Sequence, residues 1–244
     1  MKSKTLFLFD VDGTLTESRQ KINEDIKNLL EKIQAKYPVA IISGSDLVKI
    51  TEQLVDVLNF DFVFSEGGLI CHKKGIEIYQ NSISAKLGED LINKVLNFSL
   101  RELSQIHLPV KRGNFIEYRI GMLNVSPIGR SCSQKERMEF VKYDQEFKVR
   151  EKLVEKYRKE FKDQNISFSI GGQISIDIFP TGWDKRSCLP ELVKQKFDKI
   201  YFFGDKTHQG GNDHELYNDS RVEGIKVNGP DDTIVKVENL IMKL

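Results

Sequence analysis

The chain is poor in cysteine. Its 244 residues include only three, Cys71, Cys132 and Cys188, which are widely spaced and form no Cys-x-x-Cys pair. An odd, scattered set of thiols argues against a disulfide framework and against a thiolate zinc site. We therefore expect free thiols in a reducing compartment, with the cytoplasm as the location.

Long apolar runs and a bias of charge are also lacking. No run approaches the roughly 18 apolar residues that a membrane-spanning helix needs, so we expect a soluble protein with no membrane contacts. The formal net charge is only +1, which gives no overall attraction to nucleic acid, so anion binding must come from local clusters. With 39% hydrophobic residues, the chain can bury a substantial core.

The stretch from Thr5 to Thr14 is the strongest local signal. Residues 5–9 are apolar or β-branched without alternation, which is typical of a strand buried on both faces of a parallel sheet. Asp10 and Asp12 follow, and residues two apart on extended backbone point to the same side. Gly13 permits a sharp turn after them. The alternative interpretation is an acidic turn with no chemical role.

These two carboxylates indicate phosphoryl chemistry. Two close carboxylates repel one another, and oxygen ligands favour Mg²⁺ over zinc as the ion that neutralises them. A bound cation in turn attracts phosphate. We predict that Asp10 attacks phosphorus to form an aspartyl-phosphate, while Asp12 exchanges a proton with the leaving or attacking oxygen.

The remaining pattern predicts an α/β fold built on a Rossmann-like parallel sheet. Asn23 should cap a helix, a buried strand should follow at 38–42, and Thr233 should cap the last helix. After Asn81 strict alternation of strand and helix stops, which favours an inserted α+β cap domain. We place the core domain at 1–81 and 186–244 and the cap at 82–185. Ser43, directly after the second strand, either donates to a phosphoryl oxygen or caps a turn.

A second acidic strand end lies late in the chain. The buried strand 199–203 leads to Asp205, and the glycine-rich loop 210–213 ends in Asp213. Both are candidate magnesium ligands or groups that orient one, and a glycine-rich surface turn is the alternative. Lys185 at a predicted helix start could screen charge between a carboxylate and phosphate, although most lysines are solvated. We interpret His208 and His214 as loop residues.

The cap segment carries candidate substrate ligands. Arginines grip phosphate with paired hydrogen bonds, and four of them fall close together in sequence: Arg112, Arg119, Arg130 and Arg137. Ser175 and Asp177 alternate with isoleucines on one strand, so both belong to its polar face, where they suit a polyol. The alternatives are that the four arginines are scattered over the surface and that Ser175 and Asp177 face solvent. Closure of such a cap would exclude water.

Several motifs together resemble one enzyme family. The Asp10-Val11-Asp12-Gly13-Thr14 run resembles the first motif of the haloacid-dehalogenase-like phosphotransferases. Four further blocks resemble the haloacid-dehalogenase-like phosphomannomutases, and the first is highly specific: 113–134, 168–175, 182–186 and 202–207. The similarity covers nearly the whole chain. Ile120, Gly67 and the pair His208-Gln209 depart from the family pattern, without touching the acidic residues.

The resemblance implies a role for each matching residue. It makes Asp10 the phosphorylated nucleophile and Asp12 the general acid/base. Ser43 or Ser45 would stand in the family's second motif, and Lys185 in its third. Catalytic Mg²⁺ would bind Asp10, the backbone of Asp12, and Asp205. Sugar-phosphate ligands would be Arg19, Arg119, Arg130, Arg137, Ser175 and Asp177. A second cation would bind at Tyr217, Asp219 and Val222. Arg112 has no ligand counterpart.

The activity implied is interconversion of mannose 6-phosphate and mannose 1-phosphate, which supplies GDP-mannose for glycosylation. A hexose 1,6-bisphosphate would act as activator, and a homodimer would form through the cap. A sugar-phosphate phosphatase with the same nucleophile is the main alternative, because tenfold partitioning to water costs only about 1.4 kcal/mol. A non-catalytic sugar-phosphate sensor is a second alternative, which the intact acidic residues oppose.

Overall fold

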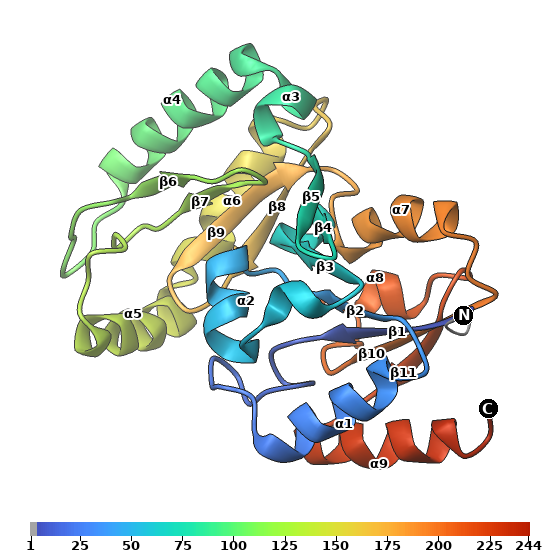
Figure 1. Ribbon diagram of the computed structural model, residues 1–244. Helices are drawn as coiled ribbons and strands as arrows, with labels where there is room; N and C mark the ends of the chain where they lie inside the picture. The colour runs from blue at the N-terminus through green and yellow to red at the C-terminus, as the bar shows by residue number, and fades with distance from the viewer. Residues whose placement is uncertain (1–3) are drawn as a thin grey trace. The chain divides into compact units, whose positions relative to one another are not determined.

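The computed structural model describes residues 4–244, and these divide into two compact units (Figure 1). The first unit comprises residues 4–80 and 183–244, and the second comprises 81–182. Asn81 therefore lies in the second unit, and residues 183–185 lie in the first. The domain bounds expected from the sequence assigned Asn81 to the core and 183–185 to the cap. The segment after Gly182 packs on the first unit. Gly68 lies so close to this segment that an added Cβ would be 2.9 Å from the backbone nitrogen of Cys188.

The first unit is built on a mixed sheet in the order β11-β10-β1-β2-β3-β4-β5. The first five of these strands are parallel, and β4 and β5 form an antiparallel hairpin at one edge. The strands are β1 (Thr5–Asp10), β2 (Val39–Ile42), β3 (Phe62–Ser65), β4 (Ile70–Lys73), β5 (Ile76–Gln80), β10 (Lys199–Gly204) and β11 (Glu223–Lys226).

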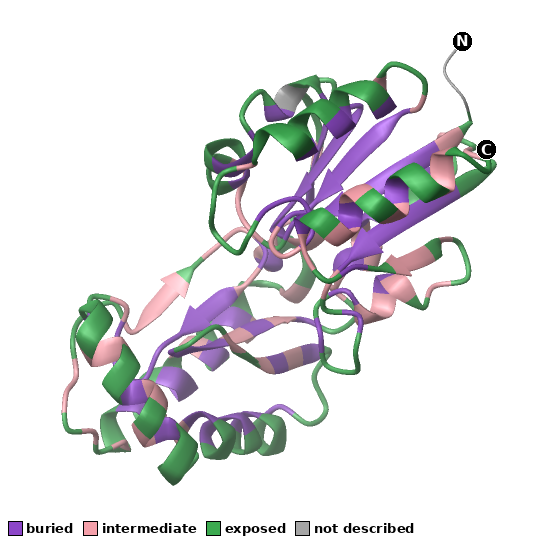
Figure 2. Ribbon diagram, turned by 90° about the horizontal axis from the view of Figure 1, so that it is seen from below, coloured by how far each residue is buried: buried purple, intermediate pink, exposed green. Residues whose placement is uncertain are grey.

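Helices cover both faces of this sheet. Phe7 and Phe9 on β1 pack toward α1, α2 and α9, whereas Leu6 and Leu8 pack toward α7 and α8. The strands β1, β2, β3 and β10 are almost wholly buried, and Figure 2 shows buried strands between helices with exposed outer faces. The helices are α1 (Glu24–Gln34), α2 (Leu47–Leu54), α7 (Leu189–Lys194), α8 (His214–Tyr217) and α9 (Pro230–Ile241), with short 3₁₀ turns at Val57–Asn59, Glu66–Gly68 and Lys185–Cys188. The α/β fold with a largely parallel sheet is confirmed.

Two predicted helix caps have different outcomes. Asn23 caps α1 as predicted, because its side chain accepts a hydrogen bond from the backbone of Ile26 at 2.9 Å. The prediction that Thr233 caps α9 is wrong. The helix begins earlier, at Pro230, whose fixed φ suits a first helical position. The Thr233 hydroxyl instead donates to the carbonyl of Thr14 at 2.8 Å, which joins α9 to the turn after β1.

The second unit is an α+β module. Its antiparallel sheet has the order β6-β7-β9-β8. One face is apolar and packs on helices, where Tyr157 lies 5.1 Å from Phe98 and 5.0 Å from Phe168 between ring centroids. The elements are α3 (Ile83–Leu87), α4 (Glu89–Gln105), β6 (Ile116–Tyr118), β7 (Leu123–Val125), α5 (Gln134–Phe147), α6 (Val149–Glu160), β8 (Ile166–Gly171) and β9 (Ser175–Pro180). No helix within 4–244 is both long and apolar enough to cross a bilayer.

Candidate active site

Three carboxylates gather at the carboxyl edge of the first unit's sheet. Asp10 is the last residue of β1 and Asp205 directly follows β10, and these parallel neighbours pair Phe9 with Phe203. Parallel strands in register end at the same edge, which brings the two acids together. Asp213 joins them from the glycine-rich loop, and one oxygen of each carboxylate lies within 4.8 Å of the others.

Lys185 is the buried cation of this cluster, with an exposed fraction of 3%. Its Nζ donates hydrogen bonds to Asp10 and, at 2.6 Å, to Asp213. Asp213 also accepts from the backbone N–H of Lys206 at 3.1 Å. Asp213 is therefore engaged on both oxygens, and it orients Lys185. Lys185 is the first residue of a short 3₁₀ turn that Asp184 caps.

The titration of the cluster reflects its burial. Burial raises the pKa of Asp10 to about 7, although the charge of Lys185 opposes the rise. Burial lowers the pKa of Lys185, but the charges of Asp10 and Asp213 outweigh this and hold it above its ordinary value. One buried ammonium thus serves more than one buried carboxylate. The excess of negative charge leaves a position that a cation would stabilise.

The same carboxylates fit Mg²⁺. Asp205 Oδ1 is buried and has no hydrogen-bond partner among the residues that the structure describes, so it is free to ligate. All the side-chain donors are carboxylate oxygens, the ligand type that Mg²⁺ prefers. Gly13 keeps the site open, because its φ is +83° and an added Cβ would lie 2.4 Å from Asp205 Oδ2.

Asp12 is held beside the cluster by two hydrogen bonds. Its Oδ1 accepts from the backbone N–H of Arg19 at 2.7 Å and from Gln53 Nε2 at 2.9 Å. Gln53 is buried at the end of α2 and also donates to Thr16 at 3.3 Å. Sequence reasoning missed Gln53, because a single glutamine in an amphipathic helix carries no spacing signal. The Arg19 side chain itself is exposed.

Ser43 follows β2 at the same edge and is 2% exposed. Its Oγ accepts a hydrogen bond from the backbone N–H of Ser45 at 3.1 Å, as a turn serine does. The hydroxyl proton is left to donate elsewhere. Both roles considered for this serine are therefore compatible with its geometry.

The three candidates for a second cation lie in one turn between α8 and β11. Tyr217 ends α8, and the backbone N–H of Val222 donates to the carbonyl of Asp219 at 3.1 Å. The Asp219 carboxylate is occupied by Arg221, with Nε at 2.8 Å and Nη2 at 2.7 Å. These hydrogen bonds lower the pKa of Asp219 to about 2. Cation binding at this turn stays a prediction, and backbone carbonyls would have to supply the ligands.

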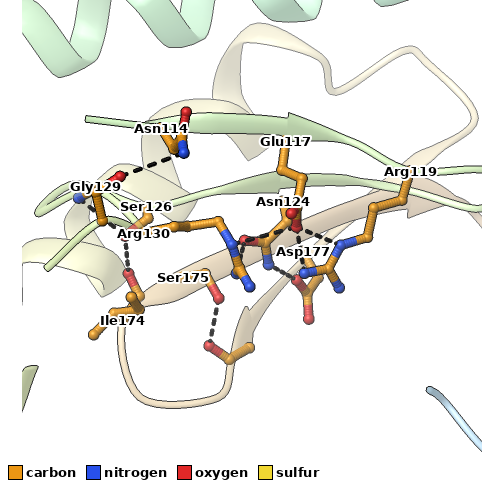
Figure 3. Close-up of polar contacts among 12 residues, drawn as sticks. Asn114, Glu117, Arg119, Asn124, Ser126, Gly129, Arg130, Ile174, Ser175 and Asp177 are labelled. Atoms are coloured by element: carbon orange, nitrogen blue, oxygen red, sulfur yellow. Dashed lines mark hydrogen bonds and ion pairs between the residues drawn. The ribbon is translucent and has the colours of Figure 1, made fainter. Parts of the chain in front are cut away.

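The second unit carries a polar network on the face of its sheet opposite the apolar core. Strand register places Glu117, Asn124 and Asp177 side by side across β6, β7 and β9. Asn124 Nδ2 donates to Asp177 at 2.6 Å, and Asn124 Oδ1 accepts from Arg130 at 2.7 Å. Arg119 pairs with Glu117 at 2.5 Å. Figure 3 shows both guanidinium groups directed toward this row of amide and carboxylate groups.

The other predicted cap ligands differ in their surroundings. Ser175 precedes Asp177 on the same face of β9, and its Oγ donates to the carbonyl of Gly171 at 3.0 Å. Burial raises the pKa of Asp177, opposed by the hydrogen bond from Asn124. The buried Nε of Arg137 has no hydrogen-bond partner within residues 4–244. Arg112 does not join the network, because it pairs with Glu136.

Glu117 and Asn124 are the cap residues that sequence reasoning missed. Each alternates with apolar neighbours on a short strand, and this period of two could have identified them as members of the Asp177 face. Ser133 and Glu136 form a capping box at the start of α5. One oxygen of the Glu136 carboxylate accepts from the Ser133 backbone, and the other accepts from Arg112.

Solved structures define the class of fold. A haloacid dehalogenase-like hydrolase from Bacteroides thetaiotaomicron superposes with a TM-score of 0.59 at 13% identity, covering 98% of this chain and 100% of that chain. IMP-nucleotidase from Plasmodium falciparum gives 0.61 at 16% identity, covering 99% and 69%. The chain therefore has the haloacid-dehalogenase-like fold.

Sequence comparison defines the family. The protein-family model described as eukaryotic phosphomannomutase matches residues 26–243 of this chain. A probable phosphomannomutase of Caenorhabditis elegans is 51% identical, covering 99% of this chain and 97% of the relative. The phosphomannomutase of Saccharomyces cerevisiae is also 51% identical, covering 96% and 92%. The chain belongs to the eukaryotic phosphomannomutase family.

Proposed function

We propose that this protein is a phosphomannomutase that interconverts mannose 6-phosphate and mannose 1-phosphate. The observation that carries the proposal is the buried group of Asp10, Asp205, Asp213 and Lys185 at the carboxyl edge of the sheet, in a chain of this family. A sensor without catalysis would gain nothing from burying several carboxylates around one lysine. Burying such a group costs folding free energy, and groups of this kind are concentrated at catalytic sites.

Asp10 is the nucleophile in this proposal. Its carboxylate oxygen forms a bond to phosphorus, and the bond between phosphorus and the sugar oxygen breaks. Asp12 gives a proton to the departing oxygen, and it later accepts the proton of the sugar hydroxyl that recovers the phosphoryl group. The hydrogen bonds from Gln53 and the Arg19 backbone hold Asp12 in one orientation for both proton transfers.

Mg²⁺ would be held by Asp10, the backbone of Asp12, and Asp205, and it would supply electrostatic stabilisation of the phosphoryl oxygens. Lys185 favours the ionised form of Asp10, against the effect of burial, and restrains its position, and Asp213 fixes Lys185. Ser43 would donate its hydroxyl proton to a phosphoryl oxygen. A hexose 1,6-bisphosphate would supply the first phosphoryl group to Asp10. Binding of a second cation at Tyr217, Asp219 and Val222 is proposed from the family resemblance alone.

The sugar phosphate would bind Arg19, Arg119, Arg130, Arg137, Ser175 and Asp177. The guanidinium groups suit phosphate, and the hydroxyl and carboxylate suit the sugar hydroxyls. Arg130 and Arg119 reach into the row formed by Glu117, Asn124 and Asp177, which restrains their side chains before substrate arrives. Such preorganisation reduces the entropy lost on binding.

The deciding experiment is a coupled assay with mannose 1-phosphate, with and without glucose 1,6-bisphosphate. We expect the wild-type protein to form mannose 6-phosphate only when the bisphosphate is present. The Asp10→Asn variant should form no mannose 6-phosphate. Phosphate release without isomerisation would replace the mutase by a sugar-phosphate phosphatase. In parallel, beryllium trifluoride should occupy the Asp10 carboxylate, and failure of this trapping would remove the covalent intermediate.

Arg130 and Arg112 offer a matched comparison in the second unit. Arg130→Ala should weaken mannose 1-phosphate binding and leave Mg²⁺ binding intact, because the two groups of ligands belong to separate units. Arg112→Ala should change neither, since Arg112 pairs with Glu136. Equal sugar-phosphate affinity in wild type and Arg130→Ala would refute the assignment of Arg130.

The cellular role is proposed from the family. Mannose 1-phosphate made by this enzyme would supply GDP-mannose for glycosylation. The buried, unpaired thiols of Cys71, Cys132 and Cys188 support a reducing location such as the cytoplasm. A homodimer through the cap domain also stays a prediction, which sedimentation equilibrium of the full chain would test.

A further inference from the structure

Arg150 is a buried arginine that the proposed chemistry does not use. It lies in the first turn of α6 and is 8% exposed. Its Nη1 reaches three backbone carbonyls of the turn that joins β8 to β9. The hydrogen bonds run to Gly172 at 3.0 Å, Ser175 at 3.3 Å and Gly171 at 3.5 Å.

Asp144 on α5 sets the orientation of this guanidinium. One carboxylate oxygen accepts from Arg150 Nε at 2.7 Å, and the other accepts from the Arg150 backbone N–H at 2.8 Å. Both side chains are one-tenth exposed. Because the carboxylate holds Nε and the backbone together, Nη1 can point in only one direction, toward the β8–β9 turn. A guanidinium carries these donors on different nitrogens in a fixed fork, an arrangement that lysine, with all its donors on one nitrogen, does not reproduce.

The turn that Arg150 holds carries two proposed substrate ligands. Gly171 pairs with Ser175 across the end of the sheet, and its carbonyl accepts from the Ser175 hydroxyl at 3.0 Å. Gly171 also lies against the Asp177 carboxylate, because a Cβ added at Gly171 would be 2.1 Å from Asp177 Oδ2. The backbone position of Gly171 therefore decides where both the hydroxyl and the carboxylate can sit.

We propose that Arg150, held by Asp144, is a positioning residue for sugar-phosphate binding. It restrains the β8–β9 turn so that Ser175 and Asp177 are oriented before the substrate arrives. It touches neither substrate nor phosphate. The inference rests on the proposed function, in that Ser175 and Asp177 are taken as sugar ligands.

Arg150→Lys is the informative variant, because lysine keeps a positive charge beside Asp144 but loses the hydrogen bonds to the turn. Arg158→Lys is the matched control. Arg158 lies on the same helix and donates to the Phe168 carbonyl at 3.4 Å, outside the turn. We expect Arg150→Lys to raise KM for mannose 1-phosphate about tenfold with a smaller change in kcat. Arg158→Lys should behave as wild type.

A double-mutant cycle separates positioning from general support of the fold. In an Asp177→Ala background, Arg150→Lys should cause a smaller loss of affinity than it causes in wild type, since part of its effect passes through Asp177. Full additivity of the two changes would overturn the proposal. An equal KM for Arg150→Lys and wild type would also overturn it.

Hydrogen exchange provides a readout that does not need activity. The backbone amides of 171–175 should exchange faster in Arg150→Lys than in wild type, and those of Arg158→Lys should not change. If wild type lacked mutase activity but this difference appeared, the proposed function would fail and the restraint of the turn would stand. Unchanged exchange in Arg150→Lys would refute the restraint itself. Asp144→Asn, which keeps the shape of the partner, should give the same pattern as Arg150→Lys.

Discussion

Asn124 donates a hydrogen bond from Nδ2 to Asp177 across the paired strands β7 and β9, at 2.6 Å. The same amide accepts from Arg130 through its oxygen. Asn124 is therefore a neutral link between the Arg130 guanidinium and the Asp177 carboxylate. Both charged groups keep capacity for a ligand that carries a phosphate and hydroxyl groups.

Asn124→Ala should weaken mannose 1-phosphate binding by one to two orders of magnitude. Asn124 restrains Arg130 and Asp177 by hydrogen bonds. The expected loss is that of about one hydrogen bond to a charged group, about 1.5–3 kcal/mol, because the substrate can still bind the less restrained side chains. Titration calorimetry would measure the loss, with Asn97→Ala on the exposed face of α4 as control. Wild-type affinity in Asn124→Ala would show that the polar row is not part of the substrate site.

Gly171→Ala should lower substrate affinity with little loss of stability. The added Cβ would meet Asp177 Oδ2, the mobile end of a side chain, so the carboxylate moves aside at small cost to the fold. We expect KM for mannose 1-phosphate to rise about tenfold while Tm changes by no more than a few degrees. Gly113→Ala is the control, because its Cβ would meet only Ser131 Oγ, at 3.8 Å. A large fall in Tm at unchanged KM would contradict this account.

Lys185→Met should destabilise the metal-free protein and abolish phosphoryl transfer. Methionine fills a similar volume but leaves Asp10 and Asp213 buried without their cation. Removing one partner of a buried ion pair costs about 3–5 kcal/mol, which urea denaturation would show. Lys206→Met is the control, because Lys206 is half exposed and lies 4.0 Å from Asp205. Its loss should cost less than about 1 kcal/mol. Equal free energies of unfolding for the two variants would show that Lys185 does not stabilise the buried carboxylates.

The stabilisation of the protein by Mg²⁺ should increase with pH. The folded pKa of Asp10 is raised to about 7, so between pH 4 and 7 the folded state binds more protons than the unfolded state. The metal-free protein therefore loses stability as the pH rises through this range. With Asp10 proposed as a ligand of Mg²⁺, protons should compete with the ion, and the gain in Tm from Mg²⁺ should be larger at pH 8 than at pH 5.5.

Asp10→Asn is the control for this pH dependence. The amide does not titrate, so the gain in Tm from Mg²⁺ should be smaller and nearly independent of pH. A pH-dependent gain of wild-type size in Asp10→Asn would place the titrating ligand elsewhere in the cluster. Thermal unfolding at several Mg²⁺ concentrations is sufficient to distinguish these outcomes.

Much of the fold is encoded locally. The unbroken apolar run before Asp10 specifies a strand buried on both faces, and Asn23 caps its helix through bonds within one turn. Capping and strand burial depend on near neighbours, so sequence patterns predict them. Thr233 shows the limit, because its hydroxyl finds a partner at Thr14, which no local pattern indicates.

What the sequence determined by itself was which chemical groups stand at the ends of the strands: Asp10 after the first and Asp205 after a later one. Only the tertiary structure decided their partners. Lys185 forms ion pairs with Asp10 and Asp213. Gln53 donates a hydrogen bond to Asp12, and Arg112 pairs with Glu136 instead of joining the other cap arginines. These pairs join distant segments, and the choice among possible partners depends on burial and on side-chain reach. Both are set only when the sheets and helices have packed.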